Sequence, residues 1–239
     1  MPETFVLIPG AWHGGWAWRP VAQRLRAAGH RAIAFTLPGL TDGEDPRELR
    51  LSDAVDYVVA ELRRRDLHDV TLVGHSWGGY PISGAAYQVP ERIRKLIYWS
   101  GFVPADGRPL LEEIPDDHAG LFAQLAEASG NNSVTLPFEA WQQGFIQDAK
   151  ESVQRLLHSL LVPQPMGYFA DGLDIPPVTS LGVPASYVYS TEDISLPAGE
   201  LAWTPRFPDR LGVTALETPG SHESCFTRPV ELADALLKA

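Results

Sequence analysis

The chain of 239 residues is 44% hydrophobic and 10% aromatic, which is enough apolar material for one large domain or for a domain with an inserted cap. Its formal net charge of -11 disfavours nucleic acid and anionic membrane surfaces as partners, because both attract clustered Lys and Arg. Cys225 is the only cysteine, so an intramolecular disulfide and a thiolate metal cluster are excluded. The apolar run directly after Thr4 leaves no room for a secretion signal, and no run is long enough to span a bilayer. We therefore expect a cytoplasmic protein.

Short apolar runs recur along the chain, and their composition is typical of strands that are buried on both faces of a sheet. Helical patterns at residues 18–28, 51–64 and 80–88 separate the first four runs. This alternation predicts an α/β fold with a doubly wound, mostly parallel sheet of six strands and helices on both faces. Gly29 is expected to end the first helix, and Ser52 to cap the second. The predicted strands are residues 5–8, 32–36, 70–73, 96–99, 186–189 and 213–216.

The alternation stops at residues 103–183, a proline-punctuated stretch without a convincing strand. So long a loop without secondary structure would be improbable in a compact domain. Amphipathic segments around Leu121 and Leu157 instead predict helices. We expect a helical cap at residues 103–183, inserted into a core made of residues 1–102 and 184–239.

The most specific motif is Gly-His-Ser-Trp-Gly at residues 74–78, which follows a predicted strand and precedes a predicted helix. This context is what a nucleophile elbow requires, since the sharp turn exposes a serine hydroxyl to a base and to a helix N-terminus. Gly74 and Gly78 provide the small side chains that the crowded turn demands, and Gly79 lets the helix approach the sheet. Ser76 is therefore the predicted nucleophile.

Such a nucleophile needs a carboxylate and then a histidine later in the chain. His222 follows the last predicted strand, so it should reach the carboxyl edge of the sheet, where sites form in doubly wound folds. His118 falls in the cap, and His75 should point into the sheet. Glu192 and Asp193 both follow the fifth predicted strand. We favour Asp193, because a shorter side chain holds an imidazole with less freedom to lose, and Glu192 stays the alternative.

Two backbone N–H groups are expected to bind the oxyanion of an acyl-transfer reaction. One belongs to Trp77, the residue after the nucleophile, and the other to Ala11, in the loop after the first strand. The loop lacks the glycine spacing of dinucleotide and phosphate sites, and His222-Glu223 lacks the second histidine of a zinc protease helix. We therefore expect no cofactor and no metal.

Aromatic residues near these donors, together with apolar residues of the cap, predict a pocket for a small apolar or aromatic substrate. The candidates are Trp12, His13, Leu121, Phe122, Trp141, Phe145 and Leu157.

The segments at residues 5–16, 74–79 and 220–222 together resemble the α/β-hydrolase superfamily. Within it they are similar to the branch that holds plant methylesterases, hydroxynitrile lyases and bacterial esterase-like relatives. The resemblance covers both halves of the core, and the cap agrees only in length and placement. It implies a serine–histidine–aspartate triad and two oxyanion donors, which fall on Ser76, His222, Asp193, Ala11 and Trp77.

The chain departs from that branch at two places. Pro9 replaces the histidine that usually precedes the glycine of the oxyanion loop. The lyases of the branch share a threonine where this chain has Ala11 and a lysine where it has Glu223. Without that hydroxyl and ammonium, cyanide departure has no evident stabiliser, so ester hydrolysis is favoured.

The residues and the resemblance predict a serine hydrolase that cleaves a small carboxylic ester, lactone or thioester through an acyl-serine intermediate. Two alternatives stay open. The same residues could act as acid and base in carbon–carbon cleavage or cyclisation, or the chain could be a ligand receptor with little turnover. We expect a small-molecule substrate as partner, and a homodimer is an open alternative to a monomer.

Overall fold

A computed structural model describes all residues, 1–239, and its central element is a six-stranded parallel sheet in the order β2-β1-β3-β4-β7-β8. The predicted doubly wound fold is confirmed, because the chain adds β2 on one side of β1 and β3, β4, β7 and β8 on the other. The central β1 and β3 are almost wholly buried, as their unbroken apolar runs require. The strands are β1 (Thr4–Ile8), β2 (Arg31–Ala34), β3 (Val70–His75), β4 (Ile93–Trp99), β7 (Ala185–Ser190) and β8 (Leu216–Thr218).

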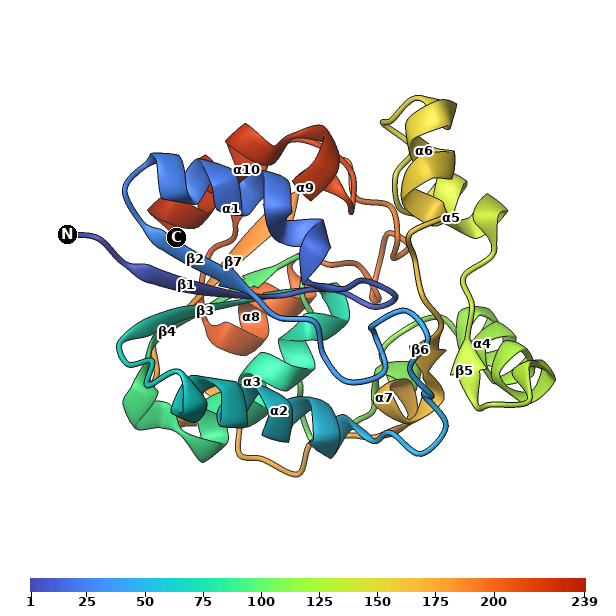
Figure 1. The fold of residues 1–239 in the computed structure, drawn as a ribbon, viewed down its shortest axis with the longest axis horizontal. Coiled ribbons are helices and arrows are strands. Elements are labelled where there is room, and N and C mark those ends of the chain that lie inside the picture. The colour runs from blue at the N-terminus through green and yellow to red at the C-terminus, as the bar shows by residue number, and fades with distance from the viewer.

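Helices cover both faces of the sheet (Figure 1). On one face α1 (Arg19–Ala27) packs beside α10 (Pro229–Lys238) and α9 (Ser224–Thr227). On the other face α2 (Leu51–Arg64) packs against α3 (Gly79–Gln88), while α8 (Arg206–Leu211) contacts β7. Two separate hydrophobic clusters, one on each face of the sheet, fill the space between the sheet and the helices. Five short 3-10 helices complete the connections: η1 (Gly15–Trp18), η2 (Ser76–Gly78), η3 (Pro90–Arg92), η4 (Leu110–Glu112) and η5 (Val178–Ser180).

The ends of two elements test the sequence predictions. Gly29, with φ +92°, follows the end of α1 as expected, because its backbone conformation favours glycine. The predicted cap of α2 at Ser52 is wrong. The helix already begins at Leu51, because the Asp53 carboxylate accepts the Arg50 N–H at 2.7 Å and closes the first turn.

The sixth strand begins later than its apolar run predicts. Gly212, with φ +66°, ends α8, and the Val213 N–H donates to the Pro208 carbonyl at 3.1 Å. Val213 therefore belongs to the helix end, and pairing with β7 begins only at Leu216, opposite Val188.

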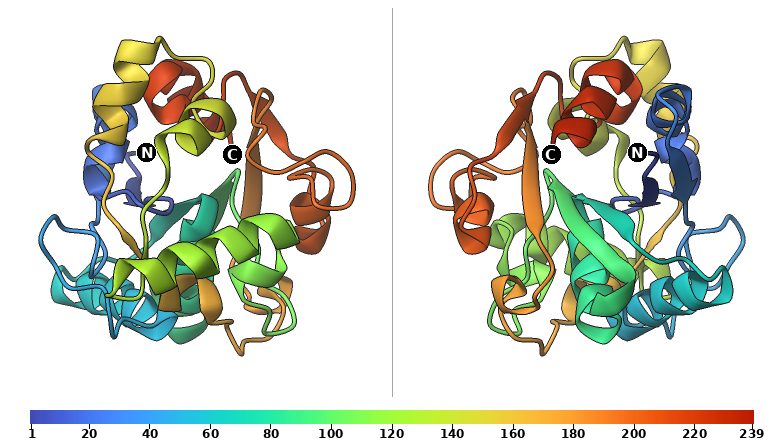
Figure 2. Two further views of the ribbon diagram at one scale, coloured as in Figure 1. Left: turned by 90° about the vertical axis from the view of Figure 1, so that its right-hand side faces the viewer. Right: turned by 90° about the vertical axis from the view of Figure 1, so that its left-hand side faces the viewer.

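Between β4 and β7 the chain forms a layer at the carboxyl ends of the strands (Figure 1). Its α4 crosses in front of the sheet in the left view of Figure 2. A pair of two-residue antiparallel strands, which the sequence did not predict, joins the helices of this layer. The elements are α4 (Asp116–Ser129), β5 (Ser133–Val134), α5 (Phe138–Gly144), α6 (Glu151–His158), β6 (Gln164–Pro165) and α7 (Met166–Ala170). None of the helices in the structure combines the length and apolar character needed to cross a membrane.

Candidate active site

Ser76 sits at the sharp turn between β3 and α3, with φ +51°, a backbone conformation that costs energy for any residue with a side chain. Neighbouring glycines make the turn sterically feasible. A Cβ on Gly74 would lie 2.6 Å from the Gly78 carbonyl oxygen, and one on Gly78 would lie 2.6 Å from the Pro9 oxygen. The segment therefore has the strained strand-to-helix geometry of a nucleophile elbow.

The loop after β1 is held in place by the layer at residues 103–183. Trp12 has φ +64°, and its backbone N–H donates to Gln164 Oε1 at 2.8 Å. Its indole Nε1 donates to the Val134 carbonyl at 2.8 Å. Because β5 and β6 anchor Trp12 in this way, the preceding Ala11 is fixed at the wall of the cavity that also contains Ser76.

Trp77, the second predicted oxyanion donor, is fixed by its side chain. The indole Nε1 donates to the Tyr168 carbonyl at 2.9 Å, and the two rings are stacked with centroids 4.8 Å apart. Ala11 and Trp77 both line the cavity beside Ser76. The structure thus places the two predicted oxyanion donors, Ala11 and Trp77, beside the predicted nucleophile, Ser76.

His222 and Asp193 form a buried pair on the loops after β8 and β7. Nδ1 of His222 lies 2.7 Å from Oδ2 of Asp193, and both side chains are almost fully excluded from solvent. Burial alone lowers the pKa of His222, but attraction to Asp193 and the hydrogen bond between them outweigh it, so this pKa is raised. Burial raises the pKa of Asp193, and the attraction and hydrogen bonds from His222 and Ser195 outweigh that effect, so this pKa is lowered. The pair therefore favours a charged carboxylate beside a basic imidazole.

Glu192, the alternative carboxylate, has another partner. Its side chain is exposed and Oε1 accepts the Gly220 N–H at 3.1 Å. Asp193 is therefore the residue that meets His222, as the shorter side chain predicted.

His75, next to the predicted nucleophile, packs against His222. Its ring stacks on Trp99 with centroids 3.8 Å apart, and Nε2 lies 3.0 Å from the His222 carbonyl oxygen. Burial and the neighbouring His222 place the pKa of His75 well below its ordinary value. His75 is therefore neutral, and because a carbonyl only accepts, its Nε2 carries the proton.

Ser76, His222 and the two predicted oxyanion donors, Ala11 and Trp77, line one cavity with a volume of about 50 Å³. Of the predicted pocket residues, Trp12, Phe122 and Phe145 line it. Its only titratable side chains are His118 and His222. The lining consists of Ala11, Trp12, Ser76, Trp77, Phe102, Leu110, Ile114, His118, Phe122, Phe145, Phe169, Ser195, Leu196, Trp203 and His222.

Four predicted pocket residues do not line this cavity. Leu121 is exposed, because its neighbour Phe122 occupies the inward side of α4. Trp141 is fully buried between α5 and α6, where its indole donates to the Gln154 carbonyl at 3.0 Å. His13 and Leu157 pack elsewhere: Nδ1 of His13 lies 2.7 Å from the Ala11 carbonyl oxygen, and Leu157 packs on the hydrophobic core.

Several lining residues were missed by the sequence reasoning. Phe102, Ser195 and Leu196 follow strands β4 and β7, so their position at the carboxyl edge of the sheet was a usable signal. Trp203 and Phe169 had no such signal, because tertiary packing alone brings them to the cavity. His118 was assigned to the cap but not to the pocket.

The residues best suited to hold a metal ion are His75, His222 and Glu223, whose ligand atoms lie within 4.8 Å of one another. Two of their nitrogens already have partners. Nδ1 of His222 faces Asp193, and Nε2 of His75 donates to a carbonyl. In His222 this contact leaves Nε2 as the nitrogen that is available for proton transfer.

A parallel sheet of this order, a serine at a strained elbow and a buried histidine–aspartate pair on later loops together define the α/β-hydrolase class of enzyme. Residues 5–235 match the Alpha/beta hydrolase family, and the chain belongs to that family.

Relatives agree with this assignment. An extracellular α/β-hydrolase from a Paenibacillus species superposes with a TM-score of 0.95 at 32% identity, covering 100% of this chain and 99% of that one. Methylesterase 1 of Arabidopsis thaliana is 27% identical over 99% of this chain and 95% of its own. A carbendazim hydrolyzing esterase of a Nocardioides species is 42% identical, but the match spans only 47% of each chain. The protein is thus an α/β hydrolase with esterases among its relatives.

Proposed function

We propose that the protein is a serine esterase that cleaves a small, uncharged apolar or aromatic carboxylic ester, lactone or thioester. The observation that carries this proposal is the buried pair of His222 and Asp193, whose imidazole shares one cavity with Ser76. With Nδ1 held by the carboxylate, Nε2 is the nitrogen left to exchange a proton.

In the proposed reaction, Ser76 Oγ attacks the acyl carbon and its proton passes to His222. The carbonyl electrons move to the oxygen, which the N–H groups of Ala11 and Trp77 stabilise, by several kcal/mol in comparable sites. Collapse expels the alkoxide or thiolate, which takes the proton from His222 and leaves an acyl-serine. Water then attacks this ester with His222 again as base, which releases the acid and restores Ser76.

The cavity wall supports an uncharged substrate. No Lys, Arg, Asp or Glu lines it, and a charge placed there would lose its hydration without gaining an opposite charge. Its volume of about 50 Å³ favours a small group on at least one side of the ester bond.

Carbon–carbon cleavage by the route of the resembling lyases finds less support. Ala11 has no hydroxyl, and Glu223 does not line the cavity but points toward His13, with 3.7 Å between its Oε2 and His13 Nε2. The positions that carry the threonine and lysine in the resembling lyases thus offer no cation at the reacting group.

The test is hydrolysis of a graded series of p-nitrophenyl esters and simple lactones by the wild type and by Ser76→Ala. We expect turnover in the wild type, a mass increase equal to one acyl group on Ser76 in rapidly quenched samples, and loss of both in the variant. Full activity of Ser76→Ala would contradict the proposal. Labelling of Ser76 by a fluorophosphonate without turnover of any ester would favour the other two readings.

We also propose a cytoplasmic location, which the single cysteine supports because no disulfide can form within the chain. The Paenibacillus relative is described as extracellular, so fractionation of cells that express the protein decides this point.

A further inference from the structure

Ser195 lies two residues after Asp193 and donates two hydrogen bonds to one oxygen of the Asp193 carboxylate. Its hydroxyl donates to Asp193 Oδ1 at 2.7 Å, and its backbone N–H donates to the same atom at 3.0 Å. The other oxygen, Oδ2, faces His222 Nδ1 at 2.7 Å. Both oxygens of the buried carboxylate are therefore occupied, and the group has no free rotation about its terminal bond.

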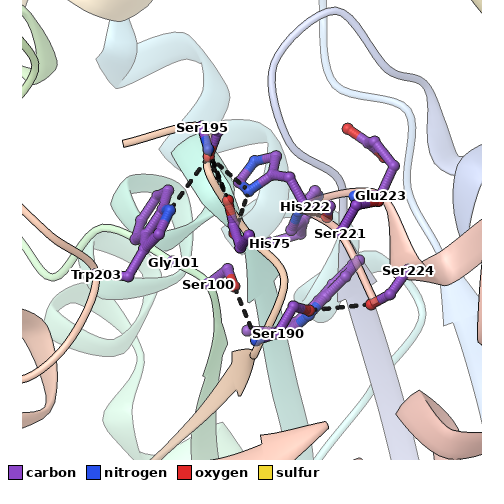
Figure 3. Close-up of polar contacts among 12 residues, drawn as sticks. His75, Ser100, Gly101, Ser190, Ser195, Trp203, Ser221, His222, Glu223 and Ser224 are labelled. Atoms are coloured by element: carbon purple, nitrogen blue, oxygen red, sulfur yellow. Dashed lines mark hydrogen bonds and ion pairs between the residues drawn. The ribbon is translucent and has the colours of Figure 1, made fainter. Parts of the chain in front are cut away.

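Trp203 fixes the direction of that hydroxyl. Its indole Nε1 lies 3.1 Å from Ser195 Oγ, and its ring stacks on the His222 ring with centroids 5.4 Å apart and an interplanar angle of 22°. An indole N–H only donates, so the Ser195 oxygen accepts this bond and its hydrogen stays directed at Asp193. Figure 3 shows Ser195 between Trp203 and His222.

The hydroxyl oxygen also touches the base itself. Ser195 Oγ lies 3.1 Å from His222 Nδ1, the nitrogen that donates to Asp193. The Ser195 oxygen thus meets three groups of the site at once, and only one placement of its single hydrogen satisfies them all (Figure 3).

We infer that Ser195 and Trp203 form a positioning pair that holds the Asp193 carboxylate in the orientation at which it keeps Nδ1 of His222 protonated and Nε2 free. The inference rests on the proposed function, because it assigns a role in the reaction of Ser76. Neither residue exchanges a proton with the substrate in this scheme. Ser195 and Trp203 also line the cavity, so the two residues that orient the Asp193 carboxylate form part of the wall around the substrate.

The variants Ser195→Ala, Ser195→Thr and Trp203→Phe separate orientation from folding. Ser195→Ala removes the hydroxyl but retains the backbone N–H bond to Asp193, so the loop keeps one of its two contacts. We expect kcat to fall about tenfold with KM within about twofold of the wild type, since a hydrogen bond to a charged group is lost. Ser195→Thr keeps the hydroxyl and should recover most of the rate.

The pH profile gives a readout that a merely structural role would not move. Without the hydroxyl, the negative charge of Asp193 concentrates on the side that faces His222, so the imidazole gains a proton more easily. The acidic limb of kcat/KM should therefore shift to higher pH in Ser195→Ala and return toward the wild-type position in Ser195→Thr. Ser180→Ala is the matched control, because that exposed serine bonds only to the nearby Pro177 carbonyl, and it should change neither rate nor profile.

A double-variant cycle tests whether the two residues act as one unit. If they do, Ser195→Ala combined with Trp203→Phe should lose little more rate than Ser195→Ala alone. If the fold-loss of rate in the double variant equals the product of the fold-losses in the two single variants, the two residues act independently and the positioning pair is overturned. Wild-type kcat and pH profile in Ser195→Ala, or an equal loss in Ser195→Thr without a shifted limb, would overturn the role of Ser195.

These outcomes differ from failure of the proposed function. An inactive Ser76→Ala beside a fully active Ser195→Ala contradicts only the positioning role. An active Ser76→Ala contradicts the esterase mechanism, and the positioning role falls with it.

Discussion

Nε2 of His75 donates to the backbone carbonyl of His222 at 3.0 Å, and the two rings lie with centroids 4.5 Å apart. The residue before the proposed nucleophile therefore holds the main chain of the proposed base. This contact joins the elbow after β3 to the loop after β8, two segments that are 147 residues apart in the sequence.

His75→Phe tests this contact. The substitution keeps a flat ring on Trp99 but removes the N–H that binds the His222 carbonyl. We expect the free energy of unfolding to fall by about 1 to 3 kcal/mol, because a buried acceptor loses its partner. We also expect a lower kcat, since His222 is held less firmly. Urea unfolding and ester hydrolysis measure the two effects, and unchanged values in both would contradict a role for the contact.

The activity should depend on pH through His222. Burial lowers the pKa of its imidazole, but Asp193 more than compensates, so this pKa is raised above 6.5. The base works only when neutral, so kcat/KM should rise with pH and reach half of its plateau above pH 6.5. A profile of kcat/KM for an ester whose own hydrolysis is slow over that range checks this, and a midpoint below 6.5 would count against the assignment.

If the proposed triad operates, Asp193→Asn should reduce kcat by about ten-thousand-fold, because an amide favours the wrong tautomer of the histidine. Glu192→Gln is the matched control. Glu192 is the neighbour of Asp193, but its side chain is exposed and accepts the Gly220 N–H rather than contacting His222. It should retain nearly all of the activity. If Glu192→Gln were the inactive variant, the alternative carboxylate would be the functional one.

Phe122→Ala should change which esters are accepted. Phe122 lines the cavity, with its ring centroid 5.2 Å from that of Phe169 and 5.7 Å from that of Trp12. Removing the ring enlarges the cavity, so we expect the preferred acyl chain in the p-nitrophenyl series to lengthen. Leu121→Ala, at the exposed neighbour, should leave the preference unchanged. The same shift in both variants would argue against Phe122 as a cavity wall.

Glu113→Gln tests what fixes the layer over the site to the core. The Glu113 carboxylate is fully buried and pairs with Arg206 and Arg210 of α8, the latter at 2.9 Å. Removing its charge leaves two arginines without their anion, and we expect a loss of about 3 to 5 kcal/mol in the free energy of unfolding. Glu112→Gln, exposed and 3.5 Å from Arg108, should cost under about 1 kcal/mol. Equal losses measured by urea unfolding would contradict this reading.

Local patterns in the sequence predicted most of the sheet and the residues that lie together at its carboxyl edge. Buried parallel strands are mostly apolar runs, so β1, β3 and the second half of β4 could be predicted from the local sequence, whereas Arg94 and Lys95 interrupt the run in the first half of β4. The elbow at Ser76 needs small neighbours at fixed spacing, which is a property of a few consecutive residues. The carboxyl ends of parallel strands meet at one edge, and this rule predicted that His222 and Asp193 would come together.

The substrate-facing wall, in contrast, was decided by tertiary packing. Leu121 and Phe122 are adjacent on one helix, and only the placement of α4 over the sheet turns one ring inward and the other side chain outward. Trp141 was also predicted to line the pocket, but its indole in α5 donates to the Gln154 carbonyl in α6. Trp203 lies further along the same loop as Asp193, and its stacking on the His222 ring has no signal in the local sequence. The sequence shows which residues are apolar. The direction in which each side chain points depends on what its helix or strand packs against.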